Sequence, residues 1–173
     1  AGPQTDYFRS PDGSVVNNSA VIFTEVDNTK PFTFTAKVQP EFTETGTYSA
    51  GVIYAYENDT HCQKLCFEQD EYGDHRVVSV RTLGTSDDNN HQAITAPYVY
   101  MRLSSDGTTL GSYFSEDGKI WRMARLYKND FPEKLLIGIS SQSPKDNEHT
   151  CLFTEVSLTD KPVADFRKGN IAE

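Results

Sequence analysis

The charged residues that are best placed to bind a ligand or do chemistry lie in one stretch, KLCFEQDEYGDHRVVSVRT, residues 64–82. The pattern predicts two short strands joined by a polar turn. Strand alternation places Lys64 and Glu68 on one face, and a two-residue turn at positions 72–73 brings Arg81 to the same face. A turn one residue longer moves Arg81 to the opposite face. The register of this hairpin therefore decides whether three charged groups share one surface, where they would form charge-assisted hydrogen bonds to a polar ligand.

A second group of polar side chains lies in TSDDNNH, residues 85–91, which includes Asp87 and Asp88. Carboxylate and amide oxygens are the ligands that calcium prefers, but the spacing is not that of an EF-hand loop. Asp and Asn also occur in turns because their side chains hydrogen-bond the nearby backbone. We interpret the stretch as a loop at the rim of a binding surface, with a calcium site as the alternative.

The single tryptophan, Trp121, follows the turn SEDGK. An aromatic face can stack on a flat apolar face of a ligand, but packing in the core or against the turn is the more common role. The four histidines lie at expected strand ends or turns and form no Ser/His/Asp or Cys/His pattern. No phosphate-binding glycine loop is present either, so the sequence predicts no organic cofactor.

The chain has three cysteines, Cys62, Cys66 and Cys151, which are too few for a disulfide scaffold. Because their number is odd, at least one must stay free. Cys62 and Cys66 lie roughly 13 Å apart on one extended strand, which is beyond bridging distance. A bridge from Cys151 to either of them stays open as an alternative to buried free thiols. A zinc site is less favoured because structural zinc usually takes four ligands in close pairs.

Turn signals recur at short intervals along the chain, and strand-length runs lie between them. No convincing amphipathic helix interrupts the series. The pattern predicts an all-β fold, a jelly-roll sandwich of two antiparallel sheets. The expected strands are residues 19–23, 32–38, 48–56, 63–68, 76–82, 98–104, 110–115, 121–126, 135–141 and 151–158.

Alternation within three of these strands separates an apolar face from a mixed face of charged, Tyr and Ser side chains. Such a mixed face occurs either on a ligand-binding groove or on a solvated sheet stabilised by cross-strand pairs. The apolar face is predicted to carry Leu65, Phe67, Val78, Val80, Val99, Met101 and Leu103, and the mixed face Lys64, Cys66, Glu68, Val77, Ser79, Arg81, Tyr98, Tyr100 and Arg102.

The composition limits the partners of the chain. Its 173 residues suffice for one domain with a full core, and ten Phe and nine Tyr agree with a strand-rich fold. A net charge of −9 repels nucleic acid and anionic membrane surfaces. No apolar run approaches the length that spans a bilayer. We therefore expect no nucleic-acid partner and no membrane insertion.

Six motifs in this order resemble an uncharacterised family related to the fungal "regulation of enolase" protein, within the concanavalin A-like lectin/glucanase superfamily. The resemblance covers roughly residues 30–160. Two positions depart from the family pattern: Cys62 stands where a Trp is typical, and YFS replaces a Tyr-Ser dipeptide. The motifs are AGVIYAY (50–56), KLCFE (64–68), VVSVRTLGTSDD (77–88), VYMRL (99–103), YFSEDGKIWRMARL (113–126) and IGISSQSP (137–144).

The resemblance implies a curved sandwich whose concave sheet is the surface where superfamily members commonly bind sugars. Hydrolases of this superfamily carry three carboxylates on one strand, two of them placed for retaining hydrolysis. The nearest match here, EQDEY from Glu68, lacks the third carboxylate, because Tyr72 and Gly73 occupy the positions where it would stand. Hydrolysis in that mode is therefore not expected, although a carboxylate pair assembled across strands, such as Glu68 with Asp87 or Asp88, stays open.

The function predicted from the sequence is recognition of an oligo- or polysaccharide on the concave sheet, without catalysis. The charged groups would bind sugar hydroxyls, and the bases would also bind a uronate carboxylate. A glycoside hydrolase or lyase, and a protein-interaction domain without a sugar site, are the two alternatives. The predicted ligand-binding residues are Lys64, Glu68, Arg81, Asp87, Asp88, Tyr100, Arg102, Tyr113 and Trp121.

We expect one sandwich domain over residues 1–173, of which residues 160–173 form a loosely packed tail. The compartment depends on the source: secreted or periplasmic for a bacterial protein, cytoplasmic for a fungal one.

Overall fold

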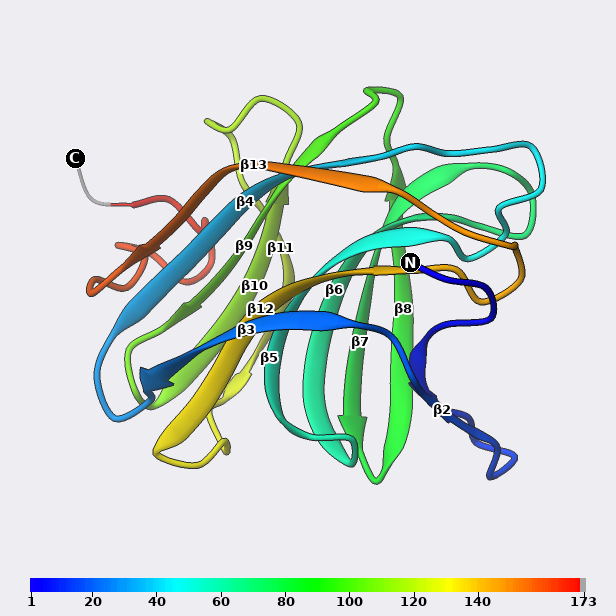
Figure 1. Ribbon diagram of the computed structural model, residues 1–173. Coiled ribbons are helices and arrows are strands. Elements are labelled where there is room, and N and C mark those ends of the chain that lie inside the picture. The colour runs from blue at the N-terminus through cyan, green and yellow to red at the C-terminus, as the bar shows by residue number, and fades with distance from the viewer. Residues whose placement is uncertain (172–173) are drawn as a thin grey trace.

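The structure is a computed structural model that describes residues 1–171 as thirteen β-strands (Figure 1). Within these residues, no helix has the length and apolar character needed to cross a membrane. The predicted all-β class is confirmed. The strands are β1 (Tyr7–Arg9), β2 (Val15–Asn17), β3 (Val21–Asp27), β4 (Phe32–Pro40), β5 (Ala50–Asn58), β6 (His61–Gln69), β7 (His75–Leu83), β8 (Thr85–Ala93), β9 (Val99–Ser105), β10 (Thr109–Ser115), β11 (Arg122–Lys128), β12 (Lys134–Gln142) and β13 (Cys151–Thr159).

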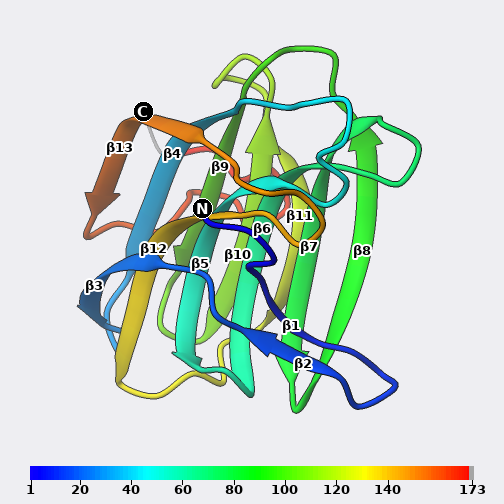
Figure 2. The same cartoon turned by 45° about the vertical axis from the view of Figure 1, so that its right-hand side comes forward.

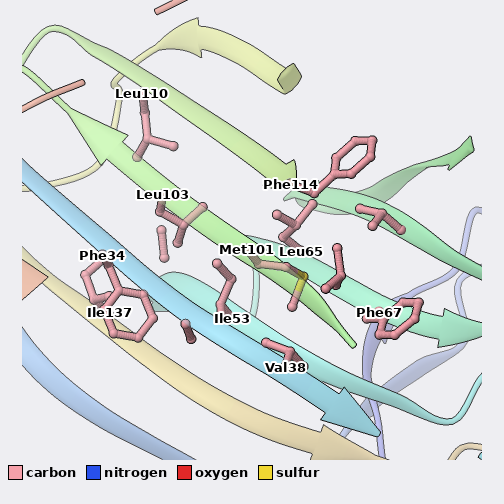
Figure 3. Packing of buried hydrophobic residues seen from close by; sticks show 14 of the residues in the cluster. Phe34, Val38, Ile53, Leu65, Phe67, Met101, Leu103, Leu110, Phe114 and Ile137 are labelled. Atoms are coloured by element: carbon pink, nitrogen blue, oxygen red, sulfur yellow. The ribbon is translucent and has the colours of Figure 1, made fainter. Parts of the chain in front are cut away.

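Two antiparallel sheets pack face to face. One has six strands in the order β3-β12-β5-β6-β7-β8, and the other has five in the order β11-β10-β9-β4-β13. Apolar side chains from the facing sides of both sheets fill the space between them, among them Phe34, Leu65 and Met101 (Figure 3). This core accounts for the alternation in most strands, because every second side chain is removed from water.

All ten predicted strands are present, with boundaries that shift by a few residues. The structure adds β1, β2 and β8. The stretch TSDDNNHQA, interpreted from sequence as a rim loop, forms the nine-residue edge strand β8. Its polar composition concealed it because an edge strand that is largely exposed on both faces needs no apolar alternation.

The six-stranded sheet is buried on both faces near its centre. In β7, Val77 belongs to the core between the sheets, whereas Val78 and Val80 belong to a second apolar cluster on the outer face of the same sheet. The sequence-based facing of β7 was therefore wrong, and that of β6 and β9 was right. A strand with apolar side chains on both faces gives alternation no way to tell inside from outside.

The second apolar cluster is covered by the β1–β2 hairpin, which lies on the outer side of the six-stranded sheet (Figure 2). The ring of Tyr7 in β1 makes edge contacts with Tyr54 and Tyr56 of β5, with centroids 6.0 and 5.9 Å apart. Polar contacts fix the other side of the hairpin, where the backbone N–H of Arg9 donates to Ser86 of β8 at 3.0 Å. The hairpin thus covers only part of the outer face.

The sequence predicted a loosely packed C-terminal tail. In the structure this segment lies against the outer face of the five-stranded sheet. Val163 is buried, and its N–H donates to Ser104 Oγ at 2.9 Å. The carbonyl of Gly169 accepts from Arg102 at 2.6 Å, and that of Phe166 accepts from the Tyr113 hydroxyl at 2.8 Å. Residues 172 and 173 of the predicted tail lie outside the described residues.

All three cysteines are free thiols, so the bridge from Cys151 that the sequence left open does not form. Cys62 and Cys66 are buried on the outer face of β6, while Cys151 packs against the core from β13. Gly51 of β5 makes this packing possible, because a Cβ at that position would collide with the sulfur of Cys151 and a methyl of Val38.

We predict that removing residues 161–173 lowers the free energy of unfolding by at least about 2 kcal/mol, because Arg102 and Tyr113 lose buried hydrogen-bond partners. Urea denaturation measures the change. A shorter truncation of residues 171–173 keeps these contacts and serves as the control. Equal stability of the long truncation and the full chain would show that the segment is loosely held.

Candidate functional site

A pocket of about 930 Å³ opens on the outer face of the six-stranded sheet, beside the β1–β2 hairpin. Lys64 and Glu68 of β6 form its floor, and both are more than nine-tenths buried. Asp88 and Asn90 of β8 line it from one side, and Gln142 of β12 from the other. Asp6 and Phe8 of the hairpin region and Tyr48 also line the pocket.

Lys64 links the floor of the pocket to the N-terminal segment. Its ammonium donates to Asp6 Oδ1 at 2.6 Å and to Gln142 Oε1 at 3.0 Å. Burial disfavours the charged amine, but Asp6, together with Cys66 and Glu68, outweighs this effect, so the pKa of Lys64 lies above its usual range. Lys64 therefore stays charged, and its charge is largely compensated within the protein.

Glu68 lies four residues further along the same face of β6 and accepts no hydrogen bond from the residues that the structure describes. Burial raises the pKa of Glu68 to about 8; Lys64 opposes this shift, and the carboxylates of Asp6, Asp88 and Asp70 add to it. A carboxyl group with unused hydrogen-bonding capacity therefore faces the pocket, which is the kind of group that a polar ligand can satisfy.

Backbone strain marks the rim of the pocket. Tyr48 has a φ of 63° and Gln4 a φ of 55°, both in the left-handed region that side chains other than glycine rarely adopt. Tyr48 is held there by two hydrogen bonds: its N–H donates to Gln69 O at 2.7 Å, and its carbonyl accepts from Gln142 Nε2 at 3.2 Å. Strained residues of this kind gather at functional sites, because the surrounding contacts fix a particular side-chain position.

Three of the nine predicted residues line this pocket: Lys64, Glu68 and Asp88. Strand pairing brings them together, because Lys64 pairs with Val80 of β7, and Val80 pairs with Asp88 of β8. The predicted grouping of all nine residues on one surface is wrong.

Arg81 lies on the opposite face from Lys64. The loop between β6 and β7 contains five residues instead of two, so Lys64 pairs with Val80 and Arg81 pairs with Gln63. Arg81 lies near the space between the sheets, where its guanidinium forms an ion pair with Asp130 at 2.5 Å and stacks over the Tyr127 ring.

Asp87 also faces away from the pocket, since it precedes Asp88 on an extended strand. It forms an ion pair with Arg125 of β11 at 3.2 Å, and Asp87, Arg81 and Arg125 line a smaller cleft of about 520 Å³ between the sheets. Because Asp87 and Asp88 point to opposite faces, they do not converge on one calcium ion. In the described part of the chain, no three His, Cys, Asp or Glu side chains gather as a metal site.

Of the other four predicted residues, three belong to the five-stranded sheet and Trp121 lies next to it. Tyr100, Arg102 and Tyr113 lie on its outer face, and the C-terminal segment binds Arg102 and Tyr113 there. Trp121, which precedes β11, stacks on Arg102 with 3.6 Å between the guanidinium carbon and the ring centroid. Alternation had placed Tyr100 and Arg102 correctly on an outer face, but it could not distinguish the outer face of one sheet from that of the other.

Several pocket residues were missed from sequence. Alternation in IGISSQ, where Ile137 belongs to the core between the sheets, would have placed Gln142 on the opposite face. Asn90 would have followed from Asp88 once β8 was identified as a strand. Asp6 gave no local signal, because it meets Lys64 across 58 positions of sequence.

We predict that Asp6→Ala destabilises the protein by about 3 kcal/mol, because it leaves the buried ammonium of Lys64 without its counter-charge. Chemical denaturation provides the measurement. Asp59→Ala is the matched control: Asp59 forms a longer, more exposed ion pair with Arg9 of the same hairpin, at 3.8 Å, and its loss should change stability by less than about 1 kcal/mol. Equal effects of the two variants would contradict the role given to Lys64.

We also predict that Glu68→Gln stabilises the protein increasingly as the pH rises from about 5 to 8. The unfolded chain ionises Glu68 near its ordinary pKa of 4.5, whereas the folded protein does so only near 8. The unfolded state thus binds fewer protons in this window, and wild-type stability falls with increasing pH. Melting temperatures of both proteins across this range test the prediction. Glu71→Gln makes the same chemical replacement at the exposed rim of the pocket and serves as the control; an equal pH-dependent stabilisation in that variant would contradict the role given to the burial of Glu68.

Solved structures show where this fold occurs. A functionally unknown protein from Saccharomyces cerevisiae has a TM-score of 0.83 and 24% identity, over 92% of this chain and 85% of its own. A xylan beta-1,4-xylosidase from Bacillus halodurans has a TM-score of 0.63 and 14% identity, over 83% of this chain and 30% of its own. A polysaccharide lyase of family 18 has a TM-score of 0.54 and 14% identity, over 78% of this chain and 74% of its own.

These similarities confirm the concanavalin A-like sandwich. The match to the xylosidase covers less than one third of that protein. No curated protein matches the sequence significantly. The family model of proteins of unknown function DUF1349 matches residues 1–161, and the chain therefore belongs to this family.

Proposed function

We propose that this protein binds a carbohydrate in the pocket on the outer face of its six-stranded sheet, without turning it over. The observation that carries the proposal is the buried Glu68, which faces a pocket of about 930 Å³ with its hydrogen-bonding capacity unused. A cavity of this size accommodates a ligand of several hundred cubic ångströms.

The pocket offers both kinds of contact that a sugar ring uses. Carboxylate and amide groups of Glu68, Asp88 and Asn90 present acceptors and donors for hydroxyl groups. The rings of Phe8 and Tyr48 line the same pocket and can pack against the C–H face of a sugar. Lys64 contributes by orienting Gln142 through a hydrogen bond. It does not act as an unpaired cation, because Asp6 already neutralises it.

Structural relatives support this class of ligand. The names of the xylosidase and the polysaccharide lyase describe proteins that act on polysaccharides, and both contain this fold. The similarity to the yeast protein supports the resemblance to the fungal family indicated by the sequence motifs.

Catalysis by Glu68 is the second candidate, because a carboxyl group with a pKa near 8 stays protonated at neutral pH, as a general acid requires. Its neighbour in sequence, Asp70, does not assist: that carboxylate accepts N–H groups of Tyr72 and Asp74 and forms an ion pair with Arg76. Binding is therefore favoured over hydrolysis by a carboxylate pair on one strand. Release of reducing ends or unsaturated products from a polysaccharide panel, lost in Glu68→Gln, would favour the enzyme instead.

A glycan array followed by calorimetry tests the proposal with two adjacent residues of β8. Asn90 faces the pocket, whereas Asn89 pairs with Ser79 and faces the other side of the same strand. Both are exposed, so neither substitution should disturb folding. We predict that Asn90→Ala weakens binding of the best glycan about five- to tenfold, in keeping with one lost hydrogen bond, and that Asn89→Ala leaves it unchanged.

Binding that is equally sensitive to both variants would place the ligand outside the pocket. An array on which no glycan binds, together with a co-purifying protein, would favour a protein-interaction domain.

A further inference from the structure

The charges of the pocket restrict which carbohydrate it accepts. Four carboxyl groups and two amines line it: Asp6, Glu68, Glu71, Asp88, Lys64 and Lys145. Lys64 is already neutralised by Asp6 at 2.6 Å. Lys145 lies at the exposed rim and is screened by solvent. An anionic sugar therefore finds no uncompensated cation on the floor, which argues against the uronate ligand that the bases indicated from sequence.

Unlike Lys64, two of the carboxyl groups are available to bind a ligand. Glu68 is about 91% buried and has no hydrogen-bond donor among the described residues, and Asp88 of β8 lines the same pocket without an ion pair within that part of the chain. Lys64 and Asp6 neutralise each other. The remaining charged groups of the lining are three carboxyl groups, Glu68, Glu71 and Asp88, and one amine, Lys145.

We propose that the pocket selects carbohydrates that carry a free amino group, with Glu68 as the acceptor for the sugar ammonium and Asp88 as its second carboxylate. The proposal rests on the proposed carbohydrate site and specifies its ligand class. An ammonium has three donors and no acceptor, so it satisfies a carboxylate that lacks any donor. It also adds a positive charge to that of Lys64, which offsets the burial that makes an ionised Glu68 unfavourable.

Calorimetry with two matched hexamers tests this selectivity: a fully deacetylated chitosan hexamer and its fully N-acetylated counterpart, which has the same backbone without the charge. We expect the protein to bind the deacetylated hexamer at least about tenfold more tightly. A tenfold difference in affinity is about the contribution of one charge-assisted hydrogen bond. Glu68→Gln should reduce this preference to about twofold or less, with the larger loss of affinity for the deacetylated hexamer. Asp88→Asn, at an exposed position, should reduce it by a smaller factor.

Glu71→Gln is the control, because it makes the same Glu-to-Gln replacement at the solvent-exposed rim and should change the preference little. Equal affinity for the two hexamers, or tighter binding of an oligouronate, would overturn the amine selectivity and leave the carbohydrate site standing. Equal affinity for spermidine and the deacetylated hexamer would show that the amine alone is recognised, which also overturns it. Failure of every glycan on the array would instead remove the proposed function, and this inference with it.

Discussion

The ion pair between Lys64 and Asp6 connects two parts of the chain that share no strand pairing. Lys64 lies on a central strand of the six-stranded sheet, and Asp6 immediately precedes β1 of the hairpin that lies on that sheet. With a distance of 2.6 Å and little exposure of either side chain, the pair fixes where the hairpin meets the sheet. The wall of the pocket depends on this placement, because Phe8 and the β2 residues follow directly in the chain.

The double burial of the six-stranded sheet explains the electrostatics of the site. Its inner face completes the core of the sandwich, while its outer face carries a second apolar cluster that includes Tyr54, Val78 and Val80. Lys64 and Glu68 share that face with the cluster, so both are held away from water although they lie on the outside of the sandwich. Lys64 is paired with Asp6, whereas Glu68 has no hydrogen-bond partner among the residues that the structure describes, so the pocket floor carries one compensated and one uncompensated group.

Sequence reasoning recovered the fold more completely than the site. Core strands such as β9 were identified because one apolar face removes Val99, Met101 and Leu103 from water in a regular alternation. The pocket depends on features that alternation does not encode. The five-residue loop after β6 sets the register of Arg81, and Asp6 reaches Lys64 from far along the chain. Polar β8 has no apolar signal, so the strand that carries Asp88 was interpreted as a loop.

Because β8 is the edge strand of the six-stranded sheet, its residues contribute to two cavities. Residues of this one edge strand line two different cavities: Asp88 and Asn90 contribute to the outer pocket, Asp87 and Asn89 contribute to the cleft between the sheets, and Asp88 also borders that cleft. Substitution of Asn90 or of Asn89 therefore alters one cavity while the other keeps its lining, whereas a change at Asp88 affects both. A one-residue insertion within the strand also affects both, because it exchanges the two sets and transfers the chemistry of each cavity to the other.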